Sequence, residues 1–119
     1  MRVYISSHSL DKANELATAL EAAGHTVTSV WHRDGGPKLP LTEVAEWRDR
    51  ADRNFLNICQ SDVLALIGHT ERVPGGKFVE AGYAMGKDIR VYVVGEVENG
   101  MMTCATPVTD TADLLRHLA

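Results

Sequence analysis

The sequence has little of several features that would define a class of protein on their own. Its 119 residues contain only two cysteines, Cys59 and Cys104, far apart and outside any CxxC pattern. That count excludes a disulfide framework, and we expect both thiols to be reduced and buried. No apolar stretch is long enough to cross a bilayer, and the first residues enter a strand-like segment without a secretory apolar region. These absences predict a cytoplasmic protein with no membrane partner.

Several motifs that carry chemistry are also missing. The five histidines show neither HxH nor HExxH spacing, so we expect no metal. There is no GxSxG elbow, and the cysteines lack an activating partner, which disfavours hydrolysis through Ser or Cys. There is no GxGxxG fingerprint, and Gly75-Gly76-Lys77 is not a Walker A loop because Phe78 follows it. The sequence therefore predicts a protein without a cofactor.

The balance of charge excludes a general nucleic-acid binder. The formal net charge is -4, whereas a polymeric nucleic acid calls for a basic face. Arg48, Arg50 and Arg53 alternate with Asp49 and Asp52, a pattern more typical of a solvated helix face than of a phosphate track. A single small phosphorylated ligand stays compatible with this composition.

The residues that are present predict one globular domain over residues 1–119. Hydrophobic residues make up 45% and charged residues 24%, so the chain can bury a core without staples. There is no internal repeat. The one Pro/Gly-rich interruption, residues 33–40, is short enough to be a loop within a domain.

Strand-like and helix-like segments alternate along the chain. We expect strands over residues 3–5, 27–31, 63–67 and 89–94, the last two apolar on both faces. We expect helices over residues 10–23, 43–58, 75–86 and 110–118. Candidate helix caps are Ser9 and Thr42 at N-termini and Gly24 at a C-terminus, and Asp110 opens the last helix.

This order, with room for one further strand, predicts an α/β fold: a three-layer, doubly wound parallel sheet of four to five strands, flavodoxin-like or Rossmann-like. In such sheets ligands bind beyond the carboxyl ends of the strands. We therefore expect the site in the loops after Ile5, Trp31 and Ile67.

Glu80 is the strongest candidate for chemistry. It lies about one turn into the predicted helix, between the apolar or small residues Val79 and Ala81. A carboxylate there is costly to bury unless it is used or paired. The helix N-terminus would help to keep it ionised, as a nucleophile requires. On composition alone, an ordinary first-turn glutamate that stabilises the helix dipole is an equal alternative.

Three further features have simpler explanations when each is taken alone. Gly75 and Gly76 would let the backbone approach a ligand, but a plain turn explains them as well. Tyr4 lies in the first strand, where core packing is the simpler explanation. Asp62 stands before the third strand, at the end of the sheet opposite to the expected site, where Asp commonly begins a strand.

Together these residues resemble the nucleoside 2-deoxyribosyltransferase family, including the related 2′-deoxynucleoside 5′-monophosphate N-hydrolases. The resemblance runs from residue 3 to about Met102 and is most specific over GGKFVEAGYA at 75–84 and GKDIRV at 86–91. NICQSD at 57–62 is similar to the family's segment that ends in a functional aspartate. The resemblance implies an enzyme that cleaves or transfers at the N-glycosidic bond of a nucleoside or nucleotide.

The resemblance also implies roles for particular residues. Glu80 would attack C1′ of the sugar, Tyr4 would hold or polarise its carboxylate, and Asp62 would aid proton delivery to the departing base. The substrate contacts implied by position are Ser6, Gly75, Gly76, Lys77, Asn99 and Met101. The segment from Asn99 to Met101 resembles one that reaches into a neighbouring subunit's site, which implies a homodimer or a larger homo-oligomer.

Pro74 departs from the family pattern. The transferases carry an acidic residue at that position and the nucleotide hydrolases a phosphate-binding serine, so neither substrate class is favoured. Lys77 can supply a cation to a phosphate or be a solvated first-turn side chain. A non-catalytic nucleotide-sensing module of the same fold is the main alternative. A flavodoxin-like or structural partner domain is a weaker alternative, supported only by the hydroxyls of Ser6, Ser7 and Ser9.

Overall fold

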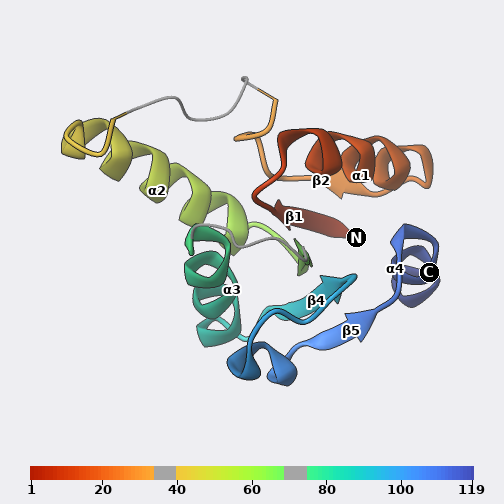
Figure 1. Ribbon diagram of the computed structural model, residues 1–119. Helices are drawn as coiled ribbons and strands as arrows, with labels where there is room; N and C mark the ends of the chain where they lie inside the picture. Colours follow the sequence, from red (N-terminus) through yellow and green to blue (C-terminus); the bar gives the residue numbers. More distant parts are fainter. Residues whose placement is uncertain (34–39, 69–74) are drawn as a thin grey trace.

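The computed structural model describes residues 1–33, 40–68 and 75–119. Its five strands form one parallel sheet in the order β2-β1-β3-β4-β5 (Figure 1). The strands are β1 (Arg2–Ser6), β2 (Thr26–Val27), β3 (Val63–Ile67), β4 (Arg90–Val94) and β5 (Thr106–Val108). The helices are α1 (Leu10–Ala22), α2 (Val44–Cys59), α3 (Gly76–Gly86) and α4 (Thr111–Leu118), with a 3-10 turn η1 (Gly100–Cys104). This architecture confirms the predicted doubly wound, flavodoxin-like α/β fold.

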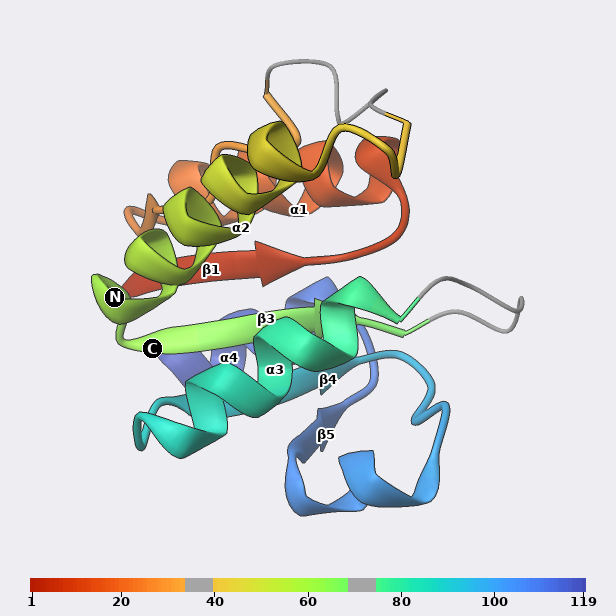
Figure 2. The same ribbon diagram turned by 90° about the vertical axis from the view of Figure 1, so that its left-hand side faces the viewer.

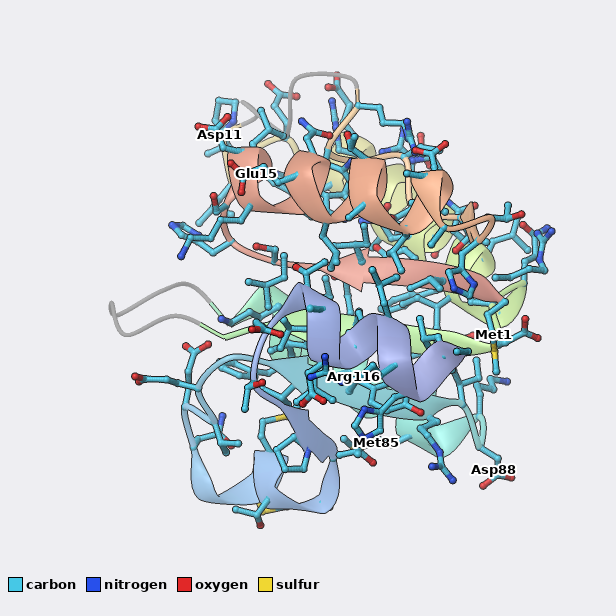
Figure 3. The ribbon with its side chains drawn as sticks, turned by 90° about the vertical axis from the view of Figure 1, so that its right-hand side faces the viewer. Met1, Asp11, Glu15, Met85, Asp88 and Arg116 are labelled. Carbon is cyan, nitrogen blue, oxygen red and sulfur yellow. The ribbon has the colours of Figure 1, made fainter. Side chains whose placement is uncertain are left out.

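The helices cover the sheet in two pairs. Figure 2 shows α2 and α3 in front of the strands, and Figure 3 shows α1 and α4 on the opposite side. Because successive side chains of a strand point to opposite faces, β1 serves both layers. Val3 and Ile5 join the core that includes residues of α1 and α4, while Tyr4 joins the core that includes Ile58 of α2 and Ala81 of α3.

Most of the predicted helix signals are confirmed. The Ser9 side chain caps α1 by accepting from the Lys12 backbone N–H at 3.2 Å, and Asp110 caps α4 through the Asp113 N–H at 2.8 Å. Gly24, just beyond the end of α1, has a φ of 89°, the left-handed conformation that favours glycine. The predicted N-cap of α2, Thr42, is wrong by one residue. The N-cap is Glu43, and its side chain makes no capping hydrogen bond.

The second strand is shorter than predicted, and side-chain hydrogen bonds explain why. The Thr28 N–H still donates to the Val3 carbonyl at 2.9 Å, as in a continuing ladder. Beyond it, the Ser29 hydroxyl accepts from the Ile5 N–H at 3.1 Å and the Trp31 indole N–H donates to the Ile5 carbonyl at 2.8 Å. Side chains therefore satisfy the β1 backbone where the predicted strand would have paired with it.

A chain of hydrogen bonds, buried at Ser29 and His32, holds the same segment to α1. The Ser29 Oγ lies 2.8 Å from the His32 Nε2, and the His32 Nδ1 lies 2.8 Å from the Asn14 Oδ1. The Ser–His–Asn order is that of a nucleophilic triad, but Ser29 is fully buried and its oxygen already accepts from Ile5. We interpret the chain as structural, because it fixes the carboxyl end of β1 beside the site.

The prediction of buried thiols is wrong. Cys59 and Cys104 are both exposed. Cys59 is the last residue of α2, and its sulfur lies 3.2 Å from the exposed Tyr83 hydroxyl rather than in the core. Among the described residues, no helix combines the length and the apolar character needed to cross a bilayer.

Candidate active site

Glu80 reaches from α3 to two hydroxyls of β1. The Tyr4 hydroxyl donates to Oε2 at 2.6 Å, and the Ser6 hydroxyl donates to Oε1 at 2.7 Å. Tyr4 and Ser6 are two residues apart on the strand, so their side chains share one face of the sheet, and both are fully buried. The structure thus brings together three of the residues that the sequence singles out, toward the end of β1 where a site was expected.

Burial and hydrogen bonding act on Glu80 in opposite directions. Burial raises the pKa of the Glu80 carboxyl, whereas hydrogen bonds from Tyr4, Ser6 and Asn54 lower it. Burial, followed by the charge of Glu80, raises the pKa of Tyr4 far above its ordinary value. Tyr4 therefore stays protonated and acts as a donor that holds the carboxylate, not as an acid.

Helix α2 contributes two groups that the sequence analysis missed. Asn54 donates to Glu80, and the charge of Arg53 lowers the pKa of Tyr4. The interpretation of the arginines on this helix as a solvated face is wrong for Arg53, whose Nε and Nη2 are buried. The helical spacing could have indicated this, because residues 53, 54, 57 and 58 lie on one helical face. Ile58 belongs to the core, so that face points toward the sheet.

Lys77 is buried and paired, not solvated. Its side chain is 1% exposed, and its ammonium donates to the Ile67 carbonyl at 3.1 Å and forms an ion pair with Glu98. The solvated alternative is therefore wrong, and a phosphate would have to compete with the Glu98 carboxylate for this ammonium. The pair ties the start of α3 and the end of β3 to the segment that follows β4.

A close backbone approach at Gly68 reinforces this junction. A Cβ on Gly68 would collide with the Glu96 carbonyl oxygen, so only glycine fits here. The Gly68 N–H also donates to the Val94 carbonyl at 2.9 Å. The chain after β4 therefore passes directly against the chain after β3, beside the beginning of α3.

Two glycines lie just before and at the start of α3. Gly75 is the N-cap and makes no side-chain cap, and a Cβ on Gly75 or Gly76 would meet no described atom within 4 Å. Packing among the described residues therefore does not require glycine at either position. Backbone N–H groups at the N-terminus of a helix lack intrahelical partners, so this end of α3 can bind an anionic group of a ligand. Pro74 lies outside the described residues.

Three other predicted site residues are not brought to Glu80 within this chain. The Asp62 carboxylate accepts from the Arg2 N–H at 2.7 Å, at the amino end of the sheet, far along the strands from Ser6. The Asn99 side chain accepts from the Met102 N–H at 3.0 Å, and so caps η1. Met101 is 83% exposed. The contribution of Asn99 and Met101 to a neighbouring subunit stays a prediction.

The geometry suits nucleophilic or electrostatic chemistry by a carboxylate. Glu80 is held through both oxygens by neutral donors, which orient it without cancelling its charge. In the described parts of the chain, no three His, Cys, Asp or Glu side chains gather in a way that could hold a metal ion. The candidate site is therefore built around the partly buried carboxylate of Glu80.

Comparison with solved structures places the chain in the class of flavodoxin-like α/β proteins. It matches the 2-deoxyribosyltransferase of the psychrotolerant bacterium Bacillus psychrosaccharolyticus with a TM-score of 0.78 and 21% identity, over 97% of this chain and 90% of that one. It also matches the CMP N-glycosidase of Clostridium botulinum with a TM-score of 0.61 and 13% identity, over 99% and 98% of the two chains. No protein-family model and no curated protein matches. The structural matches confirm, at the level of the fold, the resemblance to nucleoside 2-deoxyribosyltransferases.

Proposed function

We propose that this protein cleaves or transfers at the N-glycosidic bond of a nucleoside or nucleotide, with Glu80 as the nucleophile. The observation that carries the proposal is the partly buried Glu80 carboxylate, held at both oxygens by Tyr4 and Ser6. The fold supports the choice of bond, because the two matched structures belong to a 2-deoxyribosyltransferase and a CMP N-glycosidase.

The chemistry proceeds in two steps. A Glu80 oxygen attacks C1′ and forms a glycosyl ester, while the C1′–N bond breaks and its electron pair leaves with the base, which takes up a proton from solvent water. An acceptor then attacks C1′, gives up its proton to solvent, and releases Glu80 as the carboxylate. Water as acceptor gives hydrolysis, and a second base gives transfer. The carboxylate stabilises the oxocarbenium-like transition state of each step.

The neighbours of Glu80 position it. Tyr4, Ser6 and Asn54 are a phenol, an alcohol and an amide, none of which is an acid near neutral pH. They hold and orient the carboxylate; they do not protonate the departing base. Asp62 has no step in this scheme, because it lies at the other end of the sheet.

The test is a chromatographic assay for released or exchanged base. Ribo- and deoxyribonucleosides and their 5′-monophosphates are incubated with the protein, with and without a free acceptor base. We expect product from the unmodified protein and from Glu15→Gln, a matched change on the exposed side of α1 (Figure 3), but none from Glu80→Gln. Full activity of Glu80→Gln would remove the nucleophile assignment. Ligand binding without product from any substrate would favour the nucleotide-sensing module instead.

A further inference from the structure

Asn54 holds the nucleophile with one end of its amide and leaves the other end unused. Its N–H donates to the Glu80 carboxylate. Its Oδ1 is buried and has no hydrogen-bond partner among the described residues. Buried polar atoms in folded proteins are nearly always paired, because an unpaired one is costly. An unused acceptor beside the nucleophile therefore marks a place where a substrate donor can bind.

The orientation of α2 supports this assignment. Ile58, one turn after Asn54 and on the same helical face, packs in the core cluster that also contains Tyr4. Asn54 thus faces the sheet and the site. One turn along, the Nδ2 of Asn57 is also buried without a partner among the described residues. The inward face of α2 therefore presents two unused polar atoms, of which the Asn54 Oδ1 belongs to the side chain that bonds Glu80.

Chemistry near C1′ selects the group that Oδ1 can accept. A Glu80 oxygen must come within about 3 to 3.5 Å of C1′ to react. Asn54 Oδ1 shares its carbon with the nitrogen that bonds this carboxylate, so it lies close to the same point. An amide oxygen only accepts. Around C1′, the ring oxygen, the pyrimidine 2-carbonyl and the purine N3 are acceptors too, and the glycosidic nitrogen carries no hydrogen. The nearest donor is the hydroxyl on C2′.

We propose that Asn54 Oδ1 accepts a hydrogen bond from the 2′-hydroxyl of the substrate, so that the site selects ribonucleosides or ribonucleotides over their 2′-deoxy counterparts. The inference rests on the proposed function, since it places C1′ at Glu80. A deoxy substrate leaves the buried acceptor unpaired, and sites built to bond a substrate hydroxyl discriminate against the analogue that lacks it. This specificity is opposite to that of the matched 2-deoxyribosyltransferase, as its name describes it.

The test is the ratio of kcat/KM between ribo and deoxy substrates that share a base, cytidine against deoxycytidine and CMP against dCMP. We expect the unmodified protein to favour the ribo member by about tenfold to a hundredfold. Asn54→Leu should bring the ratio close to one. The change also removes a donor to Glu80, but that loss slows both substrates alike and cancels in the ratio. Asn54→Ala provides a second variant if circular dichroism shows that Asn54→Leu is unfolded.

Tyr4→Phe is the matched control. It also removes a donor to Glu80 but keeps Asn54 Oδ1, so both substrates should slow while the ratio is retained. An equal or reversed ratio in the unmodified protein, or an unchanged ratio in the Asn54 variants, would overturn the inference.

A binding measurement separates this inference from the proposed function. If no base is released from any substrate, calorimetry with CMP and dCMP still tests recognition. Binding of CMP at least about tenfold more tightly, lost in Asn54→Leu, would uphold the 2′-hydroxyl contact while the catalytic proposal fails. Equal binding of the two nucleotides, or no binding of either, would overturn the contact itself.

Discussion

On the α1/α4 face of the sheet, β1 contributes Val3 and Ile5 to a core of apolar side chains. On the α2/α3 face, the residues that alternate with them include Tyr4 and Ser6, which hold the partly buried carboxylate of Glu80. The covering helices differ in the same way. The 13 residues of α1 contribute four buried side chains, whereas the 16 residues of α2 contribute only Ile58.

One face of the sheet therefore holds an apolar core, and the other face holds the candidate active site. The α1/α4 face is stabilised by burial of apolar surface, while the α2/α3 face gives up part of that burial to hold Glu80, Asn54 and Arg53. The rings of Phe55 and Tyr83, 4.5 Å apart, still join α2 to α3. Changes on the two faces should therefore separate stability from activity, and the following predictions test that separation.

The largest expected effect is on activity at Glu80. Glu80→Gln should lower base release by about 10⁴-fold or more, because it removes the proposed nucleophile. The same change should raise the free energy of unfolding at neutral pH. Burial raises the pKa of Glu80, so the folded state disfavours its ionised form, and stability falls as pH rises through that pKa. In urea titrations, the difference in free energy of unfolding between Glu80→Gln and the unmodified protein should become smaller at acid pH. A variant less stable than the unmodified protein at pH 7 would contradict this assignment of cause.

Lys77→Met should have the next largest effect, and it acts on stability. It removes the buried ammonium from its ion pair with the largely buried Glu98, and breaking one partner of a buried pair costs about 3 to 5 kcal/mol. Urea unfolding measures the loss, with Lys12→Met on the exposed side of α1 as the control. Adding Glu98→Gln to Lys77→Met should recover part of the stability. If Lys77→Met lowers the free energy of unfolding no more than Lys12→Met does, the Lys77–Glu98 pair does not stabilise the fold.

Leu20→Ala tests the opposite face. Leu20 is fully buried in the α1/α4 core, and truncation of such a side chain costs about 2 to 5 kcal/mol. Activity per folded molecule should not change, because no atom of the candidate site lies on that face. Urea unfolding and kcat, both measured at a temperature where the variant is folded, check the two halves of this prediction. A fall in kcat of the folded variant would show that the faces are coupled.

The sequence predicted the fold well because its signals are local or periodic. The continuous apolar runs at β3 and β4, the cap residues Ser9 and Asp110 and the glycine after α1 all act within a few residues. The rule that ligands bind at the carboxyl ends of parallel strands then predicted a site in the loop before Glu80. The residue types alone did not separate a nucleophile from a helix-dipole glutamate, and the resemblance added that distinction.

What the sequence analysis missed depends on contacts between distant segments. The early end of β2 results from Ser29 and Trp31 bonding the backbone of Ile5. The burial of Lys77 depends on Glu98, 21 positions later. Asn54 lies on a helix whose alternating charges suggested solvent, and only the packing of that helix on the sheet turns it toward Glu80.

Tyr4→Phe should lower kcat/KM by about tenfold to a hundredfold, the usual range for a hydrogen bond to a charged group. The change also has a pH signature. The bond from Tyr4 lowers the pKa of Glu80, so its loss raises that pKa further. Because the nucleophile must be ionised, the acid limb of the pH–rate profile should move to higher pH, and Ser6→Ala should move it in the same direction. An unchanged limb would mean that Tyr4 does not hold the carboxylate during turnover.

Asp62→Asn should have the smallest effect, with kcat/KM within about twofold of the unmodified protein, as for substitutions remote from a site. Asp62 is exposed and bonds the Arg2 N–H, which precedes β1 residues Tyr4 and Ser6 on the strand. The resemblance assigns this aspartate a part in proton delivery, whereas the topology places it at the amino end, where no step of the proposed reaction occurs. A large loss of activity in folded Asp62→Asn would favour the resemblance over the topology. In that event Asp62 would have to reach a site other than the one around Glu80 of its own chain.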